Sequence, residues 1–132
     1  DGVVRWFDWQ HANLRHRADD LVWLLCDEFV PETLDPAQRL VTLARQWEGD
    51  ATRAITLGCA HVGLRLHGIL TGRAGLDVSF EDCLVHDWLG SRTSALRLCR
   101  RGAALAREAA VTRPLVDWYT HLADSLAHAL GG

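Results

Sequence analysis

Asp8 is the residue whose type and position most clearly suit chemistry, because it ends a short apolar run. Residues 3–9 are rich in β-branched and aromatic side chains, which predicts a strand that presents this carboxylate at its end. A second carboxylate, Asp20, opens the apolar stretch at residues 21–25. A carboxylate at a strand end can hold a metal ion, or it can cap a backbone N–H. The residues alone leave both roles open for Asp8, and Asp20 is equally typical of the first turn of a helix.

The two carboxylates also belong to a wider pattern of residues. It joins Val4-Arg5-Trp6-Phe7-Asp8-Trp9-Gln10-His11-Ala12 to Asp20-Leu21-Val22-Trp23-Leu24-Leu25. This pattern resembles the metal-binding segment of aminoglycoside phosphotransferases and their relatives, among them choline, homoserine and fructosamine kinases. The resemblance implies that Asp8 binds Mg²⁺, that Phe7 faces the adenine of ATP, and that Asp20 braces the catalytic loop. It implies transfer of phosphate from ATP to a hydroxyl of a small molecule, such as an amino sugar or an aminoglycoside.

Several features depart from that family. Arg15-His16-Arg17 stand where the family usually has Gly-Asp-Pro. The sequence has no Lys, no Gly-rich phosphate loop and no His-x-Asp-x-x-x-x-Asn segment, so we expect no catalytic residue in this segment and no activity from the chain alone. It also has no Met, and we expect an interior or C-terminal piece of a longer protein, whose remainder completes the kinase site.

The elements that would position these residues are mostly helices. Apolar residues at helical spacing predict a mainly α fold, in which a short N-terminal strand precedes about five helices. The resemblance implies that these form the C-terminal helical part of a protein-kinase-like fold. We expect one unit over residues 1–132, with the strand and metal-binding turn at 1–12 and a helical substrate-side subdomain at 13–132. The predicted helices and one loop cover residues 18–30, 36–48, 52–71, 72–90 (the loop), 91–110 and 113–130.

Details of the helical pattern carry further expectations. Asp35 is predicted to cap the helix that begins at Pro36, and Trp47 to lie on its buried stripe. Three glycines interrupt the helix at 52–71, which indicates close approach of a neighbouring backbone or a ligand, with tight helix packing as the favoured cause. They are Gly58, Gly63 and Gly68.

Composition excludes several partners. The 132 residues carry a net charge of −3, which offers no cationic footprint for nucleic acid or an anionic membrane. No apolar run is long enough to cross a membrane, and we expect a cytoplasmic protein. The four cysteines show no metal-ligand spacing and are expected to be buried free thiols. They are Cys26, Cys59, Cys83 and Cys99.

Other polar and aromatic residues admit two interpretations each. Asp27 and Glu28 are candidate ligands for a cationic substrate, together with Glu81, Asp82 and Asp87, although a solvated acidic face is the commoner outcome. The histidines lack ligand spacing, since His61 and His67 are six apart, and surface positions are expected. The six tryptophans could stack on a ligand, but core positions are favoured. A rival to the kinase is a stand-alone helical bundle that serves as a binding or regulatory module, with Asp8 and Asp20 as caps.

Overall fold

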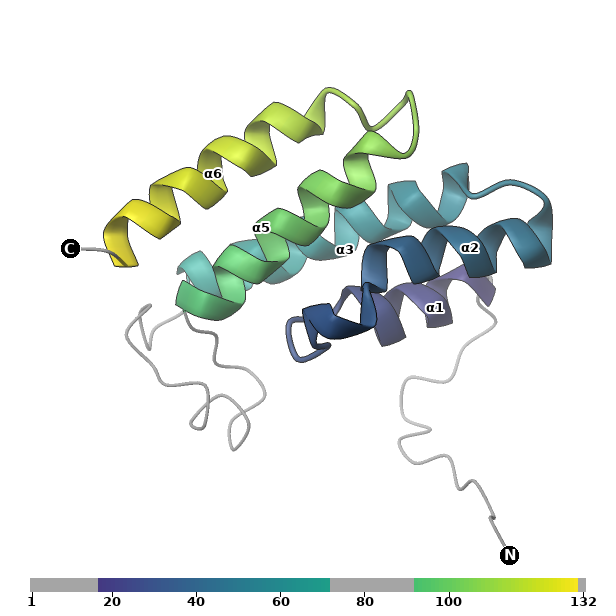
Figure 1. The fold of residues 1–132 in the computed structure, drawn as a ribbon, viewed down its shortest axis with the longest axis horizontal. Coiled ribbons are helices and arrows are strands. Elements are labelled where there is room, and N and C mark those ends of the chain that lie inside the picture. The colour runs from purple at the N-terminus through teal and green to yellow at the C-terminus, as the bar shows by residue number, and fades with distance from the viewer. Residues whose placement is uncertain (1–16, 72–91, 131–132) are drawn as a thin grey trace, which may run out of the picture.

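The computed structural model describes residues 17–71 and 92–130 of the chain, and all its regular elements there are helices (Figure 1). They are α1 (Arg17–Cys26), the 3₁₀ turn η2 (Glu32–Leu34), α2 (Pro36–Glu48), α3 (Thr52–Thr71), α5 (Arg92–Arg107) and α6 (Leu115–Leu130). The mainly α prediction is therefore confirmed for these residues. The predicted strand at 3–9 and the predicted loop at 72–90 lie outside them.

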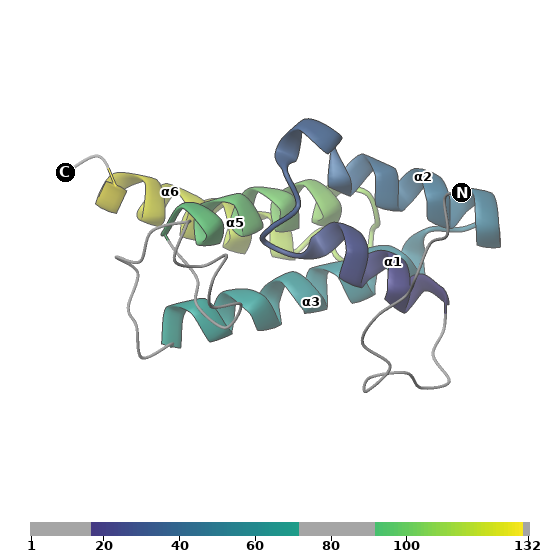
Figure 2. The same cartoon turned by 90° about the horizontal axis from the view of Figure 1, so that it is seen from below.

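Helix α3 is the centre of the bundle. It packs against α5, α1 and α2, whereas α6 packs chiefly along α5 at the edge of the molecule. Figures 1 and 2 show this order from two sides, with α6, α5 and α3 running side by side and α1 next to α3. None of the described helices is both long and apolar enough to cross a membrane.

The buried face of α3 matches the spacing that predicted it. Its members recur at alternating steps of four and three residues, so they line one side of the helix. They are Ile55, Cys59, Val62, Leu66 and Ile69. Leu40 of α2 and Leu98 and Leu105 of α5 are fully buried in the same core.

A tyrosine fixes the crossing of α3, α5 and α6. The Tyr119 hydroxyl of α6 donates a hydrogen bond to the carbonyl oxygen of Cys59 in α3 at 2.7 Å. Its ring lies so close to Gly102 of α5 that a Cβ there would approach ring carbons to 2.6 Å. We call Tyr119, Gly102, Cys59 and Gly63 the tyrosine junction, because Gly63 lies beside the same hydroxyl. Glycine at 102 is what allows the ring to lie against the helix.

The three glycines predicted to mark close approach in α3 differ from one another. A Cβ at Gly58 would lie 3.1–3.2 Å from side chains of three neighbouring helices, so tight packing is confirmed there. A Cβ at Gly63 would lie 3.6 Å from the Tyr119 hydroxyl oxygen, an ordinary contact distance. No atom of the described residues lies within 4 Å of a Cβ at Gly68, which is exposed near the end of α3, so the prediction finds no support there.

Several predicted helix ends and one predicted cap need correction. Helix α5 ends at Arg107 and not at residue 110, and α6 begins at Leu115 and not at residue 113. Helix α1 ends at Cys26 and not near residue 30, because the following turn is held by side chains of α3 and α5. Asp35 makes no side-chain cap at the start of α2. It adopts a left-handed conformation with φ 47° and closes η2 by donating its N–H to the Glu32 carbonyl at 2.9 Å. Pro36 does occupy the first turn of α2, as predicted.

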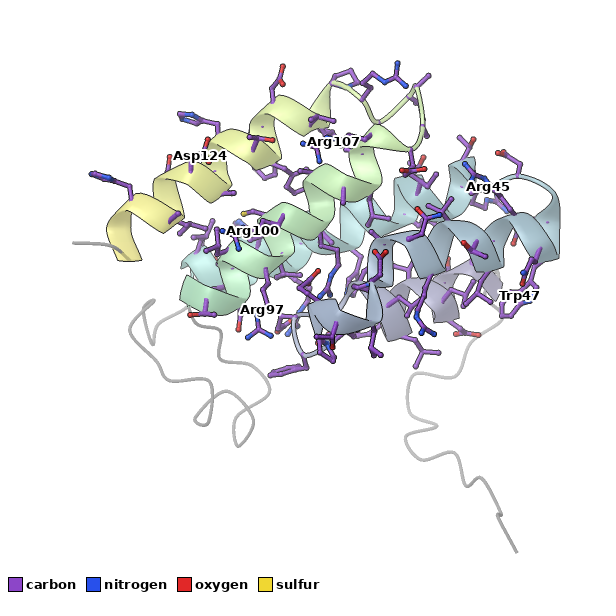
Figure 3. All side chains as sticks on the ribbon, in the orientation of Figure 1. Arg45, Trp47, Arg97, Arg100, Arg107 and Asp124 are labelled. Atoms are coloured by element: carbon purple, nitrogen blue, oxygen red, sulfur yellow. The ribbon has the colours of Figure 1, made fainter. Side chains whose placement is uncertain are left out.

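The prediction that tryptophans lie in the core is wrong for the three described ones. Trp23 is 53% exposed, Trp118 is 51% exposed and Trp47 is 44% exposed. Figure 3 shows Trp47 near the C-terminal end of α2. Small residues fill much of the core instead, since many buried side chains of α2, α3 and α5 are Ala. The other three tryptophans lie outside the described residues.

Candidate functional site

The residues predicted to bind metal and nucleotide, Asp8 and Phe7, lie outside the described residues. Asp20, their predicted companion, is exposed in the first turn of α1. The opposite face of that helix is fixed in the core by Leu21 and Val22. A carboxylate in the first turn stabilises the positive end of the helix dipole. Asp20 therefore lies at the surface of a well-packed helix, and in the sequence this helix follows the segment that contains Asp8.

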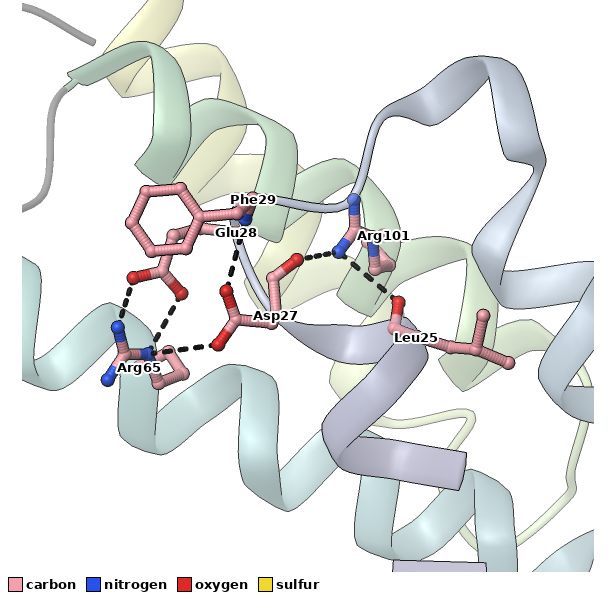
Figure 4. A network of polar contacts seen from close by, with 6 residues as sticks. All are labelled: Leu25, Asp27, Glu28, Phe29, Arg65 and Arg101. Atoms are coloured by element: carbon pink, nitrogen blue, oxygen red, sulfur yellow. Dashed lines mark hydrogen bonds and ion pairs between the residues drawn. The ribbon is translucent and has the colours of Figure 1, made fainter. Parts of the chain in front are cut away.

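The other predicted site residues, Asp27 and Glu28, lie at the opposite end of α1. Glu28 is 0% exposed, and its carboxylate is paired with both Nε and a terminal nitrogen of Arg65 in α3 (Figure 4). The Nε to Oε2 distance is 2.8 Å. Such a two-point contact offsets the desolvation of a buried carboxylate, which is otherwise unfavourable by several kcal/mol.

Asp27 is half-buried beside the same guanidinium. One carboxylate oxygen accepts the N–H of Phe29 at 3.1 Å and the other lies 4.0 Å from Nε of Arg65. Burial raises the pKa of the Asp27 carboxyl above its usual value, and the Glu28 charge adds to this, while the Phe29 N–H and Arg65 act in the opposite direction. Asp27 is thus a carboxylate whose ionised form is held less firmly than that of an ordinary surface Asp.

Arg101 of α5 holds the backbone of this turn. Its side chain is fully buried, and it donates to the carbonyl oxygens of Leu25, Asp27 and Val30 and to the carboxylate of Glu32. The Val30 bond measures 2.7 Å. The Leu25 carbonyl belongs to the last turn of α1, and those of Asp27 and Val30 follow it. Because the last carbonyls of a helix lack partners within the helix, Arg101 acts as a cap supplied from a distant helix. We call the set Asp27, Glu28, Glu32, Arg65 and Arg101 the polar junction.

The expectation of a solvated acidic face is wrong for Glu28, and the physical reason is its arginine partner. Reasoning from the sequence missed both Arg65 and Arg101. A usable signal existed for Arg101, because it stands on the apolar face of its helix, between the buried residues Leu98 and Leu105. The predicted role of Asp27 and Glu28 in binding a substrate stays a prediction.

His61 of α3 lies next to the polar junction. Its ring makes an edge contact with the ring of Trp23 from α1, with centroids 4.9 Å apart and an interplanar angle of 64°. Its Nε2 atom is buried and has no hydrogen-bond partner among the described residues. Burial lowers the pKa of His61 below its usual value. His67, His121 and His128 are exposed, which confirms the surface prediction for those three.

Metal-ligating side chains do not gather in the described ranges 17–71 and 92–130, where no group of three or more His, Cys, Asp or Glu could hold an ion. Three cysteines there are free and buried, as predicted, and Cys83 lies outside. Burial raises the pKa of the Cys59 and Cys99 thiols to about 11 and that of Cys26 to about 12. They are therefore protonated and poor nucleophiles at neutral pH.

Comparison with known proteins gives no family for this chain: no family model, curated protein or solved structure matches it.

Proposed function

We propose that this chain is part of an ATP-dependent phosphotransferase that phosphorylates a hydroxyl of a small molecule. Asp8 would bind Mg²⁺ and Phe7 would contact the adenine of ATP. The base that accepts the hydroxyl proton would come from a further part of the protein, since this sequence has no matching catalytic segment. The acceptor would be an amino sugar, an aminoglycoside or a similar small molecule, as the family resemblance implies.

The observation that carries this proposal is the place of Asp20. It follows the Asp8 segment, and its carboxylate is exposed in the first turn of α1 while the other side of the helix is buried. An anchored helix with a free carboxylate at its start suits a brace for a neighbouring loop. In phosphoryl transfer the protein mainly positions reactants and neutralises charge, so such fixed supports contribute directly to rate.

The test is phosphate transfer by the natural protein that contains this chain, measured with labelled ATP, Mg²⁺ and a panel of hydroxyl acceptors. The panel contains amino sugars, aminoglycosides, choline and homoserine. Asp8→Asn removes the metal-binding charge and should lower kcat by roughly 10²-fold or more, since a bound metal contributes several kcal/mol to the transition state. Helical circular dichroism should stay unchanged.

Asp19→Asn is the matched control. Asp19 neighbours Asp20 in the first turn of α1, but the proposal gives it no role in catalysis. This variant should keep its rate, whereas Asp20→Asn should lose activity because the brace is weakened. Transfer to none of the acceptors, or an Asp8→Asn variant with full activity, would refute the proposal.

A second candidate is a stand-alone helical module that binds a partner without catalysis. One observation favours it: the described helices already pack together around one shared core. The two candidates differ in a simple measurement. A module of this kind would show no Mg²⁺-dependent binding of ATP in calorimetry, and Asp8→Asn would leave its partner binding unchanged.

A further inference from the structure

The contact between Trp23 and His61 is a direct link between α1 and α3 outside the hydrophobic core. Trp23 is about half exposed, and its ring meets the imidazole edge to face. The Nε2 atom of His61 is buried without a hydrogen-bond partner in the described part of the chain. The link therefore includes a titratable ring, one nitrogen of which makes no hydrogen bond there.

Protonation changes what this position requires. A neutral imidazole carries one N–H, whereas the imidazolium carries two, so Nε2 of the charged ring must be a donor. A buried donor that lacks an acceptor is unfavourable by about 1–3 kcal/mol, and more when it is charged. The imidazolium can satisfy Nε2 only if the ring moves from its present position, and this movement breaks the contact with Trp23.

The charges around His61 act in both directions. Asp27 and Glu28, from the turn after α1, favour the imidazolium, while Arg65 from α3 disfavours it. Both carboxylates are themselves engaged by Arg65, and the Asp27 backbone carbonyl accepts from Arg101 of α5. Burial outweighs these charges, so the neutral ring is the form that fits the closed contact.

We propose that Trp23 and His61 form an acid-sensitive latch, in which protonation of His61 releases Trp23 and loosens the C-terminal half of α1 from α3. Neutral pH keeps the latch closed. In the open state, His61 has left its contact with Trp23 and binds a proton more readily than in the closed state. The population of the open state therefore rises as the pH falls below about 6.5, the usual pKa of a histidine. This device involves only α1 and α3, so it stands whether or not the proposed function is correct.

Nuclear magnetic resonance of the intact chain tests the latch without any substitution. The imidazole nitrogens of His61 are titrated between pH 8 and 5, and amide exchange in α1 is measured at pH 7.5 and 5.5. We expect the pKa of His61 to lie below the usual value for a histidine, because its ring is largely buried. Protection of residues 21–26, corrected for intrinsic exchange, should fall by up to about tenfold between these two pH values, because pH 5.5 lies about one unit below the usual histidine pKa that the open state would have.

His61→Phe keeps an aromatic ring against Trp23 but cannot be protonated. It should abolish the acid-induced loss of protection in α1, while the matched variant His67→Phe should retain it. If His61→Phe still loses protection at pH 5.5, another group, such as Asp27, drives the change and the proposal fails. A His61 pKa at or above the usual histidine value would also overturn it, because Trp23 would then stabilise the imidazolium by a cation–π contact. Should His61→Phe not fold, the wild-type titration alone decides between these outcomes.

Discussion

The polar junction and the tyrosine junction each tie α3 and α5 to a third element, but the first does so with charge and the second with shape. Each junction includes one residue of α5, and the two residues are consecutive in the sequence. Arg101 points toward the turn after α1, and the next residue, Gly102, lies against the Tyr119 ring of α6. Consecutive residues of one helix thus serve two different faces of the bundle.

The difference lies in what each junction requires. The polar junction buries the guanidinium of Arg101 and the carboxylate of Glu28 away from water. The loss of a hydrogen bond there leaves a buried polar group without a partner and lowers stability. The tyrosine junction requires only that no atom stands between a ring and a helix, with one hydrogen bond added at the hydroxyl. We therefore expect the polar junction to be sensitive to lost partners and the tyrosine junction to added volume.

The largest effect is expected from Arg101→Met. The Met side chain keeps much of the volume but removes the donor from the carbonyls of Leu25 and Val30, while the Asp27 carbonyl keeps the N–H of Val30 at 3.2 Å. Each unsatisfied buried acceptor is unfavourable by about 1–3 kcal/mol, so the free energy of unfolding should fall by about 3 kcal/mol or more. Urea denaturation followed by circular dichroism measures the change.

Arg100→Met is the control for that variant, because Arg100 is exposed one position earlier in α5 (Figure 3). Its free energy of unfolding should stay within about 0.5 kcal/mol of the natural value. Equal losses for the two variants would show that Arg101 contributes no more than a surface arginine, and the contrast between the junctions would disappear.

A larger side chain at position 102 should cause the next largest loss of stability. In Gly102→Ala the new methyl group would lie 2.6 Å from ring carbons of Tyr119, which forces the α5–α6 crossing to shift. Overpacking of this kind destabilises by about 1–3 kcal/mol. Gly68→Ala is the matched change at a position where no described residue comes within 4 Å of the new methyl group, so it should raise stability by about 0.5–1 kcal/mol through better helix propensity. A stabilising Gly102→Ala would mean that α6 adjusts freely and that shape does not fix the crossing.

The contrast between the junctions also explains what the sequence could predict. Helix α3 was predicted with its correct bounds, because the spacing of Ile55, Cys59, Val62, Leu66 and Ile69 is a local signal. The end of α1 was not predicted correctly, because it is set by Arg65 and Arg101, which lie far from α1 in the sequence. Asp35 was misread for a related reason: its left-handed backbone closes η2, and a 3₁₀ turn of three residues leaves no periodic pattern.

The candidate site was predicted less well than the fold. The exposed place of Asp20 in the first turn of α1 follows from its position before an apolar run. The burial of Glu28 could not be predicted in the same way, because a carboxylate is normally exposed. Only its partner in α3, Arg65, compensates for the burial. The exposed Trp23 was expected in the core, since apolar spacing reveals which residues share a face but not which face is covered.

The smallest loss of stability is expected when the one polar contact of the tyrosine junction is removed. Tyr119→Phe keeps the ring against Gly102 and removes only the hydroxyl that donates to the Cys59 carbonyl. That carbonyl lies inside α3, where helical geometry also directs it toward the N–H of Gly63, so it is not left without a donor. The free energy of unfolding should therefore fall by about 1 kcal/mol, the usual contribution of one buried hydrogen bond. A loss as large as that of Arg101→Met would show that this junction too depends on its polar contact, because the ring packing alone would not hold α6 on α5.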